Sequence, residues 1–120
     1  MEITVNPKGD SKVAIISSDS LVIENVQDAL DLMANVQYNG FDKMLLRKEN
    51  IIDDFFELKT RLAGEILQKY TNYRMKVAIV GDFSVYNSKS LNDFIYESNK
   101  GNQVLFKATE SEALEGLHQL

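Results

Sequence analysis

The chain has 120 residues with 18 acidic and 13 basic side chains, and its formal net charge of -5 opposes nonspecific attraction to nucleic acid and to anionic membranes. It has no cysteine, which excludes disulfides, zinc–thiolate sites and thiol catalysis. It also has neither an apolar run near the roughly 20 residues of a membrane span nor a signal-peptide pattern at its start. We therefore expect one soluble, cytoplasmic domain over residues 1–120, with no nucleic-acid or membrane partner.

A hairpin is predicted at the start of the chain. Residues 3–5 and 12–16 are mostly β-branched, as is typical of strands. The segment between them, from Asn6 to Asp10, contains the only proline, Pro7, and its composition predicts a turn. We expect this loop to be longer than a tight two-residue turn.

A helix and a short strand are predicted next. Between Asn25 and Val36, apolar side chains recur every three or four residues, which indicates an amphipathic helix. Asn25 is placed to cap its start, and the Asn39-Gly40 pair is expected to stop it. Residues 43–47 are apolar at their centre, which is typical of a buried strand.

The segment from Asp53 to Tyr70 shows the clearest helical pattern. Its apolar face is formed by Phe55, Leu58, Leu62 and Ile66. We expect Asp53 or Asp54 to cap this helix, and Gly64 within it to allow another backbone to approach closely. The apolar run 77–80 that follows is typical of a central parallel strand.

Three further elements complete the predicted fold. Ser88 or Ser90 is expected to open a helix that ends near Gly101, and residues 103–106 read as the last strand. The capping-box pattern from Thr109 to Glu112 predicts a terminal helix. The order β-β-α-β-α-β-α-β-α predicts a single α/β domain with a mostly parallel sheet and an N-terminal hairpin.

This element order resembles the STAS domain, the fold of bacterial anti-sigma-factor antagonists, from Lys12 to Leu117. Four segments are also similar to a bacterial family of domains of unknown function, family 4180, and this similarity spans nearly the whole chain. The segments are residues 25–33, 63–69, 77–83 and 94–99. The resemblance implies a STAS-like topology and supplies no activity, because the family has none assigned.

One departure from STAS antagonists affects the functional interpretation. Those proteins resemble one another in carrying a phosphorylatable serine at the start of the helix after the third strand. Here that region reads Asp53-Asp54-Phe55-Phe56-Glu57, without a serine. Two interpretations of the acidic pair stay open: helix capping, or a fixed charge that mimics the phosphorylated state.

The carboxyl ends of the predicted strands are where ligands bind in open α/β sheets. Asp53, Asp54, Asp82 and Lys107 are expected there. Carboxylates gathered at one edge could hold a magnesium ion, which gives one hypothesis: a small-ligand or metal-dependent enzyme. No nucleotide-binding glycine loop or serine-hydrolase motif occurs, and the only histidine, His118, is expected to be solvated at a frayed chain end.

The preferred hypothesis is a non-enzymatic interaction or regulatory domain that binds a protein partner or another copy of itself. Tyrosines and polar residues in the second half of the chain suggest a recognition surface that includes Tyr70, Tyr73, Phe83, Tyr86 and Tyr96. No catalytic residue, metal ligand or cofactor is predicted. The binding residues that we predict are Asp54, Glu57, Arg61, Asp82, Tyr86 and Lys89.

Overall fold

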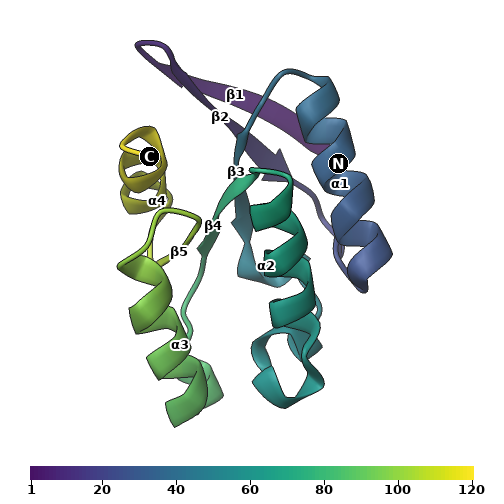
Figure 1. The fold of residues 1–120 in the computed structure, drawn as a ribbon, viewed down its shortest axis with the longest axis vertical. Coiled ribbons are helices and arrows are strands. Elements are labelled where there is room, and N and C mark those ends of the chain that lie inside the picture. Colours follow the sequence, from purple (N-terminus) through teal and green to yellow (C-terminus); the bar gives the residue numbers. More distant parts are fainter.

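The computed structural model describes all 120 residues. The chain forms one five-stranded sheet with helices packed on both faces (Figure 1). The strands lie in the order β1-β2-β3-β4-β5; β1 is antiparallel to β2, and the other neighbours are parallel. The strands are β1 (Glu2–Lys8), β2 (Ser11–Ser17), β3 (Lys43–Arg47), β4 (Lys76–Val80) and β5 (Val104–Lys107). The helices are α1 (Val26–Tyr38), α2 (Leu62–Asn72), α3 (Lys89–Asn99) and α4 (Glu110–His118). The predicted element order and α/β class are confirmed.

The N-terminal hairpin is tighter than the sequence suggested. Its two strands pair from Glu2 opposite Ser17 up to Lys8 opposite Ser11, so only Gly9 and Asp10 form the turn. The prediction of a longer loop was therefore wrong. Pro7 lies within β1 rather than in the turn, and an edge strand is where a sheet tolerates a residue without a backbone N–H.

The sheet separates two unequal hydrophobic cores. Each right-handed crossover from β2 to β5 places its helix on the same face, where α1, α2 and α3 cover a cluster of 20 buried residues. Alternate side chains of the strands point to the opposite face, which α4 alone covers. That smaller core consists of Val13, Leu45, Ala78, Leu105, Ala113 and Leu117.

The helix expected from Asp53 to Tyr70 begins later than predicted. Residues Asp53–Phe56 and Leu58–Thr60 form two short 3₁₀ turns, and α2 starts only after Arg61, whose φ is 67°. Phe55 and Phe56 are both buried in the first of these turns, where the Phe56 ring packs on Phe83 and Tyr86. The acidic pair caps neither segment, so the capping expectation was also wrong.

Side-chain capping at other helices follows the sequence pattern. Asn25 accepts a hydrogen bond from the Asp28 N–H at the start of α1, and Thr109 accepts one from the Glu112 N–H at the start of α4. Ser88, rather than Ser90, caps α3. Local sequence thus fixes where these three helices begin.

Side chains pack closely against two glycines other than Gly64. Nothing lies within 4 Å of the position that a Cβ would take at Gly64, so the expected close contact there is absent. A Cβ at Gly116 would lie 2.7 Å from Leu105 Cδ1, and one at Gly81 would lie 2.6 Å from Lys48 Cβ. Gly116 therefore lets α4 pack tightly on β5.

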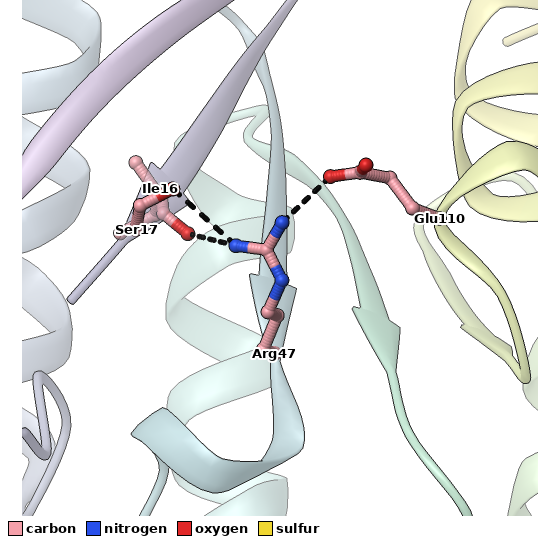
Figure 2. A network of polar contacts seen from close by, with 4 residues as sticks. All are labelled: Ile16, Ser17, Arg47 and Glu110. Carbon is pink, nitrogen blue, oxygen red and sulfur yellow. Dashed lines mark hydrogen bonds and ion pairs between the residues drawn. The ribbon is translucent and has the colours of Figure 1, made fainter. Parts of the chain in front are cut away.

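The start of α4 is tied to the sheet by Arg47 (Figure 2). Arg47 Nη2 lies 2.7 Å from Glu110 Oε1 in the first turn of α4. Its Nη1 donates to the Ile16 carbonyl at 3.1 Å and to Ser17 Oγ at 3.4 Å. One guanidinium thus joins β2, β3 and α4.

None of the four helices is long and apolar enough to cross a membrane.

We expect Arg47→Met to lower the free energy of unfolding by about 1 to 2 kcal/mol, because methionine keeps the aliphatic stem but removes the charged hydrogen bonds. Lys59→Met is the matched control, since Lys59 is paired with Glu57 at 3.0 Å but is 83% exposed. That control should change stability by less than about 0.5 kcal/mol. Urea denaturation measures both values, and equal losses in the two variants would contradict the structural role of Arg47.

Candidate functional site

A groove of about 520 Å³ lies at the carboxyl ends of β3 and β4. One wall is formed by the two 3₁₀ turns that follow β3, and the other by the segment between β4 and α3. This is the edge at which open α/β sheets commonly bind ligands. The groove is lined by Asp53, Phe56, Glu57, Leu58, Lys59, Tyr86, Ser88 and Ser90.

Stacked aromatic rings hold Tyr86 in this groove. The rings of Phe56 and Tyr86 are nearly parallel, with centroids 5.1 Å apart and an interplanar angle of 15°. Lys48 Nζ lies 5.1 Å from the Tyr86 centroid, which is within the range of a cation–π contact. Phe83 links Phe56 to Phe106 in β5, so the aromatic cluster continues into the main core. Tyr86 is therefore positioned by Phe56 of the first 3₁₀ turn and by Lys48 after β3.

The hydroxyl of Tyr86 is buried and makes no hydrogen bond of ordinary geometry. Its burial, then the negative charge of Asp53 and the contact of that carboxylate with the phenol, raise the pKa of Tyr86 to about 12. The phenol therefore stays protonated at neutral pH. Because the hydroxyl is covered and lies beside Asp53, it is not a free donor for a ligand.

Of the predicted binding residues, Glu57 and Tyr86 line the groove. Asp82 is exposed and accepts hydrogen bonds from the Ser84 side chain at 2.6 Å and from the Ser84 N–H at 3.0 Å, which lowers the pKa of its carboxyl group. Lys89 Nζ lies 2.7 Å from Asp93 Oδ2 on the outer face of α3.

The two other predicted residues are also outside the groove lining. Asp54 is exposed, and its carbonyl accepts a hydrogen bond from Thr60 Oγ1 at 2.7 Å. Arg61 is exposed and joins the second 3₁₀ turn to α2. Among the polar lining residues, the predicted set missed Asp53, Lys59, Ser88 and Ser90, although Asp53 was among the acids expected at the strand ends.

The strand-end acids do not gather into a cation site. No group of three or more histidine, cysteine, aspartate or glutamate side chains is placed to hold a metal ion. Lys107, which was expected at the same edge, lines a different cavity together with Glu112 and Glu115. The groove therefore offers hydrogen-bonding groups and a negative rim rather than a metal centre.

The tyrosine-rich surface expected from the sequence is also divided. Tyr70 is buried, and its hydroxyl donates to the Ala29 carbonyl at 2.8 Å between α2 and α1; burial raises the pKa of this phenol strongly. Tyr73 lines a cavity at the opposite edge of the sheet. Tyr96 is exposed and lies beneath the ammonium of Lys100. Of the expected set, Phe83 and Tyr86 remain together.

His118 is not a solvated tail residue. Its Nδ1 lies 2.7 Å from Ser11 Oγ, and its Nε2 lies 2.8 Å from Asn6 Oδ1. Lys43 Nζ donates to the same Ser11 hydroxyl at 2.9 Å. If Ser11 donates to Nδ1 and Nε2–H donates to Asn6, the Ser11 oxygen is left to accept from Lys43. The expectation of fraying was wrong because the end of α4 packs against the hairpin.

The chain folds as an α/β domain. The polar groups described above do not match the arrangement of a known catalytic site. The chain belongs to the family described as "Domain of unknown function (DUF4180)", whose model matches residues 8–117. No curated protein and no solved structure matches the chain. The similarity to this family that the sequence indicated is thus confirmed.

The unpaired Tyr86 hydroxyl leads to a prediction about stability. Tyr86→Phe should leave the free energy of unfolding unchanged or raise it by up to about 1 kcal/mol, because it removes a buried hydroxyl that makes no hydrogen bond. Tyr70→Phe is the matched control and should cost about 1 kcal/mol, since its hydroxyl donates to Ala29. A loss in Tyr86→Phe as large as in Tyr70→Phe, measured by chemical denaturation, would show that Tyr86 has a structural partner.

The environment of His118 leads to a second prediction. Desolvation, and then the charges of Lys43 and Lys8, lower the pKa of His118 in the folded protein. Below about pH 6.5, the ordinary pKa of histidine, the unfolded chain therefore takes up a proton that the folded protein resists. Above about pH 6.5, His118 therefore takes nothing from the free energy of unfolding, and below that pH the free energy of unfolding falls as the solution is acidified. His118→Gln should show a smaller loss of stability than the wild type between about pH 7 and about pH 5. Parallel pH profiles would contradict this assignment.

Proposed function

We propose that the protein is a non-enzymatic, STAS-like interaction module of bacterial origin that binds a basic segment of a partner protein in the groove at the carboxyl ends of β3 and β4. The observation that carries this proposal is a groove whose rim holds two carboxylates, Asp53 and Glu57, beside the stacked rings of Phe56 and Tyr86. A lysine or arginine side chain matches the rim, and an apolar residue of the same segment matches the aromatic surface.

The charges of the rim support this choice of partner. Asp53 takes part in no ion pair, and the only ion pair of Glu57 is the exposed one with Lys59. An exposed pair of this kind contributes little stability, so Glu57 can exchange Lys59 for a basic group of the partner at little cost. The stacked rings of Phe56 and Tyr86 add an aromatic surface, which is enriched at protein interfaces.

The fixed acids also affect how binding is regulated. Asp53 and Asp54 lie in the first 3₁₀ turn ahead of α2 and carry a fixed charge, which a kinase cannot switch on or off. The protein would therefore bind its partner constitutively in the cytoplasm. An enzyme that uses Asp53, Asp54 and Asp82 is the alternative, but it has less support because these acids are not clustered.

A selection from a random peptide display library tests the proposal without a known partner. We expect enrichment of peptides with lysine or arginine next to an apolar residue. The double variant Asp53→Asn/Glu57→Gln should weaken the selected peptides at least about tenfold in fluorescence anisotropy, which corresponds to about 1.4 kcal/mol. Asp82→Asn is the control for charge, because Asp82 is exposed and outside the groove, and it should leave the affinity unchanged.

Chemical-shift mapping then locates the binding site. The amides of Leu58, Lys59, Ser88 and Ser90 should shift as a selected peptide saturates the protein. Failure to enrich any peptide would contradict the proposal. Peptides that bind equally well to the double variant, or that shift amides elsewhere, would contradict it as well.

A further inference from the structure

A second cavity, of about 690 Å³, lies at the opposite, amino-terminal edge of the parallel strands. It is bounded by the hairpin turn, the α1–β3 connection and the α2–β4 connection. Four cationic side chains line it: Lys12, Lys43, Arg74 and Lys76. We refer to this cavity as the basic pocket.

The cations of the basic pocket have no ion-pair partners. The protein forms four ion pairs, and all of them involve other basic residues. Two carboxylates, Asp10 and Asp42, also line the pocket, but both are exposed and neither lies within ion-pair distance of a pocket cation. The pocket is therefore net positive, although the chain as a whole has a net charge of -5.

Lys43 is the most informative of these cations because it is only 8% exposed. Its ammonium donates to Ser11 Oγ at 2.9 Å, and Ser11 in turn contacts the His118 ring. Both neighbours are uncharged, so the hydrogen bond is not accompanied by a counter-charge. Buried charges in proteins are ordinarily paired, and an unpaired buried ammonium costs free energy that a bound anion would offset.

Backbone features make room for the cations. Gly40 has a φ of +90°, and a Cβ there would lie 3.2 Å from Lys12 Nζ. Arg74 has a φ of 60°, the left-handed conformation that ends α2, with the Met75 N–H donating to the Tyr70 carbonyl at 2.7 Å. This turn places Arg74 close to Lys76 at the pocket. Phe41 and Tyr73 supply an apolar wall beside the charges.

We propose that the basic pocket binds a small organic molecule that carries a multiply charged oxyanion, with the anionic group held by Lys43, Lys76 and Arg74. Cavities of this volume are typical of small-molecule sites, and the aromatic wall provides a surface for the organic part of the ligand. This site shares no lining residue with the groove at the other edge. The proposal is therefore independent of the partner-binding function.

Isothermal titration calorimetry with inorganic phosphate, citrate and adenosine monophosphate tests the proposal. At least one of these probes should bind saturably with a Kd of about 1 mM or lower. Arg74→Gln/Lys76→Gln should weaken that probe at least about tenfold. Lys69→Gln/Lys100→Gln is the matched control: it removes the same charge from exposed side chains outside the pocket, and the affinity should stay within about twofold.

The probes also distinguish the type of oxyanion. Tighter binding of adenosine monophosphate would assign the site to a phosphate ester, and tighter binding of citrate to a polycarboxylate; either result supports the proposal. The absence of saturable binding by all three probes would overturn it. An equal loss of affinity in the two double variants would also overturn it, since only overall charge would then matter.

Lys43→Met tests the buried cation directly. It should abolish binding while the thermal unfolding temperature stays the same or rises, because an apolar replacement removes an unpaired buried charge. Undiminished binding to folded Lys43→Met would overturn the role of the ammonium. If this variant does not fold, the wild-type protein supplies the answer: the amides of Ser11, Lys43 and Arg74 should shift on saturation with the tightest probe, and unchanged signals would overturn the proposal.

Discussion

The position of one short helix, α4, is the constraint on which the rest of the structure depends. Three right-handed crossovers place α1, α2 and α3 on one face of the sheet, so α4 alone must cover the other. It has nine residues, of which only Ala113 and Leu117 are fully buried, and a helix of this length is marginal by itself. Its polar ends therefore matter: Glu110 contacts Arg47, and His118 contacts Ser11.

These two attachments also shape the opposite edges of the sheet. At the carboxyl edge, Arg47 is directed toward α4, while the next residue, Lys48, lies over the Tyr86 ring beside the groove. At the amino edge, His118 and Lys43 share the Ser11 hydroxyl, which leaves the Lys43 ammonium buried without a carboxylate. The unpaired charge of Lys43 in the basic pocket thus lies beside the contact that holds the end of α4 on the hairpin.

The sequence predicted those features that depend on neighbouring residues. Hydrophobic periodicity and the caps Asn25 and Thr109 are local, so the element order followed from them. The 3₁₀ turns were missed because Phe56 packs on Phe83 and Tyr86, which no local pattern reveals. The contacts of His118 and Arg47 were missed for the same reason: their partners lie 107 and 63 residues away. Of the predicted binding residues, Glu57 and Tyr86 line the groove, and their placement beside Asp53 depends on the fold.

Native-state hydrogen exchange of the α4 amides tests the central claim most directly. If α4 is fixed at both ends, the amides of Leu114 and Leu117 should exchange only through global unfolding, with the same free energy as Leu45 in β3. Their exchange should then depend on denaturant as strongly as that of the strand. Fast exchange of α4 that is independent of denaturant, while β3 and β4 stay protected, would show that the helix opens locally and would contradict the account.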